Sequence, residues 1–286
     1  MSIEASSLNN TNQKNSLVFI TGATGGLGKA FAVECASRGW NLFLTDLRPD
    51  ALETLSTSLR NTYHVQACFA ACDLTDADSR SALFEQARAS NLHFWALINV
   101  AGTDYEGLFY EQTRRQIRTI IRLNIEATLE MTHAVLELRD PLATFRIINV
   151  ASLAAFYPMP VKATYAASKR FLLDFSLALR EEVRPLGATA TVLCPAGLPT
   201  THECIEAIEA QGWMGQVTTQ NIGSVASDTL DAALAGRAIH IPGMANRVLQ
   251  SLGSLVPPTL VAALIGQRWK SARQKRAHQW KQAVST

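Results

Sequence analysis

Short apolar runs alternate with longer amphipathic stretches along the chain from residue 16 onward. Such runs are typical of strands buried on both faces of a parallel sheet, and the stretches between them have the period of helices that cover it. The predicted strands are Leu17–Thr21, Asn41–Thr45, Val65–Ala71, Phe94–Asn99, Phe145–Val150, Thr189–Cys194 and Ala238–Ile241. The predicted helices are Leu27–Ser37, Pro49–Arg60, Ser79–Ala89, Arg114–Leu138, Tyr165–Val183 and Ile222–Ala235.

This alternation predicts an α/β fold, a doubly wound parallel sheet of about seven strands with helices on both faces, as in the Rossmann fold. We expect this domain over residues 16–243, after a flexible polar segment at 1–15 and before a basic helical extension at 244–286. Ligands of such sheets bind at the carboxyl ends of the strands. The residues that follow each strand are therefore the first candidates for a functional site.

The glycine-rich turn Thr21–Gly28 joins the first predicted strand to the first predicted helix. Its glycines permit positive φ and close approach of a ligand, and the helix that begins there offers free N–H groups to a pyrophosphate. Asp46 ends the second apolar run, where a carboxylate can accept hydrogen bonds from ribose hydroxyls. Together these features predict a dinucleotide site that includes Gly22, Thr24, Gly25, Gly26, Leu27, Gly28 and Asp46.

The charge on Asp46 would repel a 2′-phosphate, so we expect NAD(H) rather than NADP(H). Arg48 lies two residues further on and could bind such a phosphate. We interpret Arg48 instead as a solvated loop charge.

Two further strand ends carry cofactor candidates. Asp73 could contact the adenine or cap the following helix, but Thr75 and Asp76 are better placed as the cap, which leaves Asp73 for the nucleotide. After the fourth strand, small residues let the backbone run beside a cofactor. The candidates at these two ends are Asp73, Leu74, Asn99, Ala101 and Gly102.

A second group of polar residues suggests acid–base chemistry. Tyr165 and Lys169 stand four residues apart and share one face of a predicted helix. A lysine ammonium one turn away lowers a tyrosine pKa that is otherwise near 10, which suits proton transfer at neutral pH. Ser152 follows the fifth strand and could donate a hydrogen bond to a substrate oxygen, while Lys169 could also reach a ribose. Asn124, among apolar neighbours, is either exposed or inserted at the site.

These motifs resemble those of the short-chain dehydrogenase/reductase family over about residues 17–243. The matched positions are Thr21–Gly28, Asp73, Asn99–Gly102, Asn124, Ser152, Tyr165, Lys169, Pro195 and Thr200. The resemblance implies a catalytic set of Asn124, Ser152, Tyr165 and Lys169, in which Asn124 joins a water-linked proton relay with Lys169. It also implies a homodimer or homotetramer built on the helices that carry Asn124 and Tyr165.

The chain departs from the family pattern at two places. Val100 replaces the usual second Asn after the fourth strand, and the glycine after Pro195 stands one position later than usual. The spacing from Pro195 to Thr200 is kept, so Thr200 can still hold the nicotinamide amide. The implied cofactor residues in this segment are Pro195, Gly197, Leu198 and Thr200.

The segment at about 199–220 carries apolar residues just after the nicotinamide position, namely Ile205, Ile208, Trp213 and Met214. It is either a substrate lid or an amphipathic helix docked on the core, and its apolar content favours a lipophilic, steroid- or fatty-type substrate. Beyond Gly243 the chain is apolar and then basic, without Asp or Glu after Asp231. This extension could wrap over the active site or a dimer partner, or make weak peripheral contact with a membrane.

Composition sets limits on the other partners. Hydrophobic residues make up 48% of the chain and the formal net charge is +2, which supports a globular core and gives no reason to expect a nucleic-acid partner. The five cysteines and six histidines lack metal-ligand spacing, so we expect free thiols and no metal. We find neither a signal-peptide pattern nor a membrane-spanning run, and therefore expect a cytoplasmic protein.

The leading hypothesis is an NAD(P)(H)-dependent oxidoreductase that interconverts a secondary alcohol and a ketone, with Tyr165 as general acid and base. One alternative is a binding or regulatory protein that senses NAD on the same fold. Another is a nucleotide-sugar epimerase or dehydratase, which would need a larger C-terminal substrate domain than this chain offers.

Overall fold

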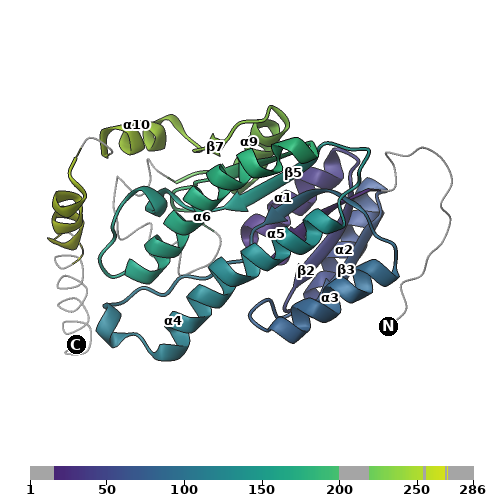
Figure 1. The fold of residues 1–286 in the computed structure, drawn as a ribbon, viewed down its shortest axis with the longest axis horizontal. Coiled ribbons are helices and arrows are strands. Elements are labelled where there is room, and N and C mark those ends of the chain that lie inside the picture. The colour runs from purple at the N-terminus through teal and green to yellow at the C-terminus, as the bar shows by residue number, and fades with distance from the viewer. Residues whose placement is uncertain (1–15, 200–218, 254–255, 268, 270–286) are drawn as a thin grey trace, which may run out of the picture.

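The apolar runs form a seven-stranded parallel sheet in this computed structural model, which describes residues 16–199, 219–253, 256–267 and 269 (Figure 1). The strands are β1 (Leu17–Thr21), β2 (Asn41–Asp46), β3 (Ala67–Ala71), β4 (Phe94–Asn99), β5 (Phe145–Val150), β6 (Ala188–Leu193) and β7 (Ile239–His240). Their order is β3-β2-β1-β4-β5-β6-β7, so the direction of winding reverses between β1 and β4. The predicted doubly wound sheet is confirmed, with the ligand crevice expected at this reversal.

The register of the sheet brings the functional loops to one edge. Thr21 of β1 pairs with Thr45 of β2 on one side and with Asn99 of β4 on the other. Asn99 pairs in turn with Asn149 of β5. Because these strands are parallel and in step, the loops that follow β1, β2, β4 and β5 leave the sheet side by side.

Helices cover both faces of the sheet, as predicted. Helices α1 (Gly26–Ser37), α2 (Pro49–Tyr63) and α9 (Ile222–Leu234) bury residues such as Phe31, Leu52 and Leu230 against one face. The other face is covered by α3 (Ala77–Ala89), α5 (Ala127–Glu137) and α6 (Ala163–Val183), through residues such as Leu83, Met131 and Leu179. Short 3-10 turns at η1 (Phe109–Glu111), η3 (Leu153–Phe156) and η4 (Arg184–Leu186) lie in the connections.

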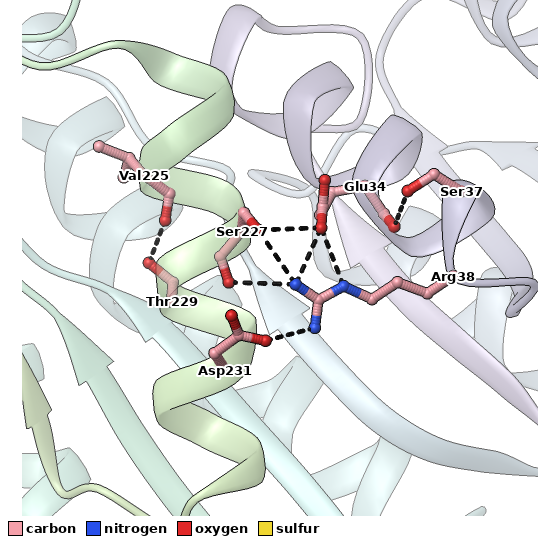
Figure 2. A network of polar contacts seen from close by, with 7 residues as sticks. All are labelled: Glu34, Ser37, Arg38, Val225, Ser227, Thr229 and Asp231. Atoms are coloured by element: carbon pink, nitrogen blue, oxygen red, sulfur yellow. Dashed lines mark hydrogen bonds and ion pairs between the residues drawn. The ribbon is translucent and has the colours of Figure 1, made fainter.

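A polar network ties α9 to α1 across more than half of the chain (Figure 2). Arg38 donates from Nη1 to Asp231 (2.7 Å) and from Nε to Glu34 (2.9 Å). Ser227 Oγ accepts from Arg38 Nη2 (3.1 Å) and donates to Glu34 (3.0 Å). The network is partly exposed, so it fixes how α9 is oriented more than it adds to stability.

The predicted helix Arg114–Leu138 is wrong as a single α-helix. The structure has α4 (Arg114–Ile120), a π-helical turn η2 (Ile121–Glu126) and then α5. One extra residue in the turn carries Asn124 inward, where its side chain is fully buried. Bulges of this kind often mark functional sites. Most other predicted boundaries lie within about three residues of those observed, a normal uncertainty for helix and strand ends.

The described part of the C-terminal extension packs on the loop between β5 and α6. Helix α10 (Met244–Gly253) is followed by a helical stretch at 258–267, which lies at the same end of the molecule as α4 (Figure 1). Tyr157 donates its hydroxyl to the carbonyl of Leu249 (2.7 Å), and Gly253 lies against the Tyr157 ring. Residues 1–15 and nearly all of the predicted lid fall outside the described residues.

Within the described ranges, every helix is too short or too polar to cross a bilayer. The same part of the chain contains no cluster of three or more His, Cys, Asp or Glu side chains that could hold a metal ion. Cys35, Cys68, Cys72 and Cys194 are free thiols, and Cys204 lies outside the described residues.

Candidate active site

A cavity of about 1350 Å³ opens at the carboxyl edge of the sheet. Most of the residues predicted from the sequence lie in its wall. They are Gly22, Gly25, Gly26, Leu27, Gly28, Asp46, Asp73, Leu74, Ala101, Gly102, Ser152, Tyr165, Lys169, Pro195, Gly197 and Leu198. The fold therefore joins motifs from the ends of six strands and from helix α6 in one site.

Three predicted residues lie behind this wall, and Thr200 is outside the described residues. Asn99 is buried, and its Nδ2 donates to Thr132 Oγ1 (3.0 Å) and to Asn149 Oδ1 (2.9 Å). Asn99 therefore joins β4 to β5 and α5, and its contact with a cofactor stays a prediction. Thr24 contacts Asp46 in the wall, and Asn124 contacts Thr103 in the wall.

The glycine-rich turn has the geometry of an anion cradle. Gly22 has a φ of +64°, and a Cβ there would lie 2.9 Å from the backbone of Ala101. Helix α1 begins directly after Gly25, and no described side chain caps it. Its first N–H groups therefore face the cavity without a side-chain acceptor, which fits a pyrophosphate.

Asp46 is held against this turn by backbone donors. Its Oδ2 accepts from Thr24 N (2.9 Å), and its Oδ1 accepts from Leu47 N (2.7 Å). Arg48 is exposed, but its Nη2 donates to Thr24 Oγ1 (2.8 Å) and more weakly to Thr24 O (3.3 Å). Arg48 is thus an exposed loop charge, as interpreted from the sequence, but its guanidinium also contacts the turn that holds Asp46.

Asp73 lines the cavity and is not the N-cap of helix α3. Asp76 is the N-cap of α3, and its Oδ2 accepts from Ser79 N (3.1 Å). Asp73 instead accepts from the backbone and hydroxyl of Thr75 (2.9 and 2.7 Å) while lining the cavity with Leu74. This agrees with the expectation that another residue caps the helix.

Tyr165, Lys169 and Ser152 converge on the cavity from α6 and the end of β5. Lys169 Nζ lies 5.7 Å from the centre of the Tyr165 ring and donates to Val150 O (2.9 Å). Ser152 is the N-cap of η3, and its Oγ accepts from Ala154 N (3.1 Å). A carbonyl group beside these side chains would meet a phenol, a hydroxyl and a nearby ammonium, the set needed for proton transfer to oxygen.

Asn124 is buried behind the site and is not exposed on its helix, whereas its role in the reaction stays a prediction. Its Oδ1 accepts from Thr103 N (2.8 Å), and its Nδ2 donates to Thr103 O and to Ser168 Oγ (both 3.0 Å). A Cβ on Gly102 would lie 3.2 Å from Asn124 Oδ1 and 3.3 Å from Lys169 Nζ, so the two polar side chains flank this glycine. The water-linked relay stays a prediction.

Burial lowers the pKa of Lys169 from 10.5 to about 8, and the nearby carboxylate of Asp104 partly opposes the change. Between pH about 8 and about 10.5, Lys169 would therefore be protonated in the unfolded chain but deprotonated in the folded chain. Unfolding then takes up a proton, which becomes less favourable as the pH rises. Below pH 8 both states are protonated, so the contribution there does not change with pH.

We expect the free energy of unfolding of the wild-type protein to rise, relative to that of the Lys169→Met variant, between pH about 8 and about 10.5. Urea unfolding of both proteins across this range measures the difference. A difference that stays constant with pH would contradict the assigned burial of the ammonium.

Three residues near the site were missed by sequence reasoning. Lys162 forms an ion pair with Asp104, and its Nζ lies 5.8 Å from the centre of the Tyr165 ring. This pair joins the loop after β4 to the loop before α6, and both residues line the cavity. The only sequence signal was the position of Lys162 three residues before Tyr165, one helical turn away.

Arg80 is the third. It is fully buried, and it donates to Leu74 O (2.7 Å), Glu126 (2.7 Å) and Glu130 (2.6 Å). It thereby connects the cavity wall at Leu74 with the π-helical turn that carries Asn124. Nothing in its local sequence distinguishes it from an exposed helical arginine.

The C-terminal extension completes the wall. Leu249 of α10, Ile265 of the stretch at 258–267 and Trp269 line the same cavity as Tyr165. With Tyr157 and Met159 they give this part of the cavity an apolar surface. The described part of the extension therefore lies over the site, which favours the alternative in which the extension covers the active site.

Comparisons with known proteins identify the family of this chain. The sequence model of the short chain dehydrogenase family matches residues 16–206. A very-long-chain 3-oxoacyl-CoA reductase of Laccaria bicolor is 30% identical over 174 residues, which are 60% of this chain and 52% of that protein. A sulfoacetaldehyde reductase of Chromohalobacter salexigens is 35% identical over 180 residues, 62% of this chain and 70% of that protein. The chain spans about half the length of the first curated relatives it matches.

Solved structures share the fold over most of the chain. A short-chain dehydrogenase from Sphingobium yanoikuyae in complex with NADPH has a TM-score of 0.70 at 26% identity, covering 85% of this chain and 96% of that one. A short-chain dehydrogenase/reductase from Burkholderia phymatum in complex with NAD has a TM-score of 0.72 at 21% identity, covering 85% and 94%. Similar folds therefore bind either dinucleotide.

Proposed function

Because this chain belongs to the short-chain dehydrogenase family, we propose that it interconverts a secondary alcohol and a ketone with an NAD(P)(H) cofactor, using Tyr165 as general acid and base. The observation that carries the proposal is the convergence of Tyr165, Lys169 and Ser152 on the cavity that also contains the glycine-rich turn. A nucleotide cradle and a proton-transfer group then face the same space.

The cofactor contacts follow from the residues in the wall. The uncapped N-terminus of α1 would hold the pyrophosphate, and Asp46 would accept from the adenosine ribose. When bound, the dinucleotide supplies or accepts the hydride. Pro195, Gly197 and Leu198 would border the nicotinamide end, close to Ser152, since Leu153 N donates to Pro195 O (2.7 Å).

Side chains of this protein would carry out the proton transfer. In reduction Tyr165 donates its phenolic proton to the substrate oxygen, while Ser152 donates a hydrogen bond to the same atom. Lys169, with a pKa near 8, is protonated at neutral pH and stabilises the phenolate that remains. In oxidation the phenolate accepts the proton from the alcohol, and the same ammonium favours the form that can do so.

We propose NAD(H) over NADP(H) from the position of Asp46. A 2′-phosphate near its carboxylate would meet a negative charge, whereas two ribose hydroxyls would meet an acceptor. Arg48 offers a counter-charge, but its Nη2 is already bound to Thr24. Solved relatives contain either dinucleotide, so the preference rests on these two side chains.

We propose a lipophilic substrate of steroid or fatty type. The named substrates of the relatives range from a very-long-chain acyl thioester to a small sulfonated aldehyde, so the argument rests on this cavity. Leu249, Ile265 and Trp269 give it an apolar wall beyond the proton-transfer residues, which favours burial of apolar substrate surface.

A screen of ketones and secondary alcohols with both dinucleotides tests the function. We expect turnover of bulky apolar ketones with NADH, and a kcat/KM at least about tenfold higher than with NADPH, equivalent to about 1.4 kcal/mol. The absorbance of the reduced nicotinamide gives the rates, and a short polar ketone is the matched control. Dinucleotide binding without turnover of any compound would favour the NAD-sensing alternative.

We also propose a homodimer or homotetramer through the helices that carry Asn124 and Tyr165. Ile121 of the π-helical turn and Phe171 of α6 are exposed apolar side chains on these elements, and Phe171 stacks on Phe175. Apolar side chains of this size on neighbouring helices are typical of an interface.

A further inference from the structure

The two described helices of the C-terminal extension expose apolar side chains on their outer surface. Met244, Val248 and Leu252 follow one another at four-residue intervals along α10, and each is 52–77% exposed. Leu260 and Leu264 have the same spacing in the stretch at 258–267 and are 50% and 56% exposed. This spacing places the members of each set on one face of their helix.

These are not the side chains that line the cavity. Leu249 and Ile265, on the same two helices, face the cavity instead. Each helix therefore has one apolar side directed to the catalytic site and a second apolar side directed to solvent. A surface helix of a soluble protein normally presents polar residues on its outer face.

Among α10 and the stretch at 258–267, the only charged side chain is Arg247, whose Nε donates to the carbonyl of Ile241 (3.0 Å). Residues 248–267 contain no charged side chain. Six Lys and Arg residues follow between Arg268 and Lys281, together with Trp269 and Trp280, and no acidic residue occurs after Asp231. An apolar segment beside basic and Trp residues is typical of helices that lie in the interface of a membrane with anionic lipids.

We propose that α10 and the stretch at 258–267 dock on the surface of an anionic lipid bilayer. The five exposed apolar side chains would enter the boundary between headgroups and acyl chains, and the basic residues that follow would pair with lipid phosphates. Because the described helices cannot span a bilayer, the contact is peripheral.

Docking through this outer side would place α10 and the stretch at 258–267 between the bilayer and the cavity that they line. Only these two helices would then separate the lipid phase from the catalytic site, which would bring a lipophilic ketone close to it. This consequence rests on the proposed function, whereas docking itself does not.

Charge favours a bilayer over a second copy of this chain as the occupant. Two copies joined through this face would bring two basic segments together, and like charges at an interface oppose association. An anionic surface attracts both segments, each basic residue near it adding to the attraction.

Flotation of the full chain with vesicles tests the proposal. We expect binding to phosphatidylcholine vesicles that contain phosphatidylserine, weaker binding to phosphatidylcholine alone, and partial release by high salt. In the Leu260→Asn/Leu264→Asn variant the partition coefficient should fall at least about tenfold, because two half-exposed leucines no longer enter the lipid. Asparagine adds no charge, so the loss would report apolar contact.

A matched variant, Leu142→Asn/Leu186→Asn, changes two leucines that are at least half exposed (78% and 50%) but lie outside the extension. It should bind vesicles like the wild type. The proposal is overturned if the wild type does not float with anionic vesicles, or if the extension variant floats as well as the wild type. It is also overturned if the extension variant changes only the oligomeric state in size-exclusion chromatography.

Flotation requires neither cofactor nor turnover, so its failure is separate from failure of the proposed function. Thermal unfolding and the rate with a water-soluble ketone check that both variants are folded. Neither Leu260 nor Leu264 lines the cavity, so neither measurement should change.

Discussion

Replacing Tyr165 by phenylalanine is expected to lower kcat by about 10³-fold while dinucleotide affinity changes by no more than about twofold. The phenol supplies the proton to the substrate oxygen, and the ring that remains preserves the packing beside Lys169. Steady-state kinetics give kcat, and titration of the dinucleotide by fluorescence gives its affinity. A variant that keeps full kcat would refute Tyr165 as the proton donor.

Tyr157→Phe is the matched control for this experiment. Tyr157 also lines the cavity, but its hydroxyl donates to Leu249 O (2.7 Å), and burial raises its pKa. Loss of this hydroxyl should change KM for the substrate by loosening α10, with little effect on kcat. An equal loss of kcat in both variants would mean that neither tyrosine has a specific role in proton transfer.

Gly28→Ala is expected to lower the free energy of unfolding by about 3 kcal/mol and to abolish dinucleotide binding. A Cβ at this position would overlap the carbonyl of Gly22 and lie 2.9 Å from Ala23 Cα, so the turn would have to open. Because these neighbours are backbone atoms, rotation of a side chain cannot relieve the overlap. Denaturant unfolding of the protein without added cofactor measures the loss.

Gly25→Ala provides the comparison within the same turn. Its Cβ would lie 3.4 Å from Gly22 O, an ordinary contact, and the φ of Gly25 is −73°. We expect the free energy of unfolding to fall by only about 1 kcal/mol, because the contact is ordinary and the remaining cost is that alanine is a poorer N-cap than glycine. Equal destabilisation by both substitutions would contradict the packing of α1 against the turn.

Local patterns in the sequence were enough for the fold and for most of the site. Buried strands in a two-sided sheet are apolar throughout, so their positions can be read without knowing their partners. The glycines of Thr21–Gly28 and the four-residue spacing of Tyr165 and Lys169 carry their geometry within a few residues. The carboxyl edge where they meet follows from the predicted winding of the sheet.

Sequence patterns could not identify the partners of side chains that contact distant elements. Asn99 matched a cofactor motif, but no local pattern indicated that its Nδ2 donates to Thr132 and Asn149. Arg48 is exposed, as expected of a loop charge, but its hydrogen bond to Thr24 had no signal in the sequence. Helical periodicity also predicted one continuous helix, because a single extra residue at Ile121–Glu126 barely disturbs the apolar pattern.

The sequence by itself determined the sheet, the glycine-rich turn and the spacing of the proton-transfer residues, because each depends on short-range backbone geometry or periodic burial. Only the tertiary structure decided that Asn124 faces Thr103 and Ser168, that Arg80 connects Leu74 to the π-helical turn, and that α10 reaches back to Tyr157, 92 residues earlier. Periodicity shows that a residue is buried but does not identify the distant atoms that surround it. For that reason the apolar wall and outer surface of the extension became visible only in the folded chain.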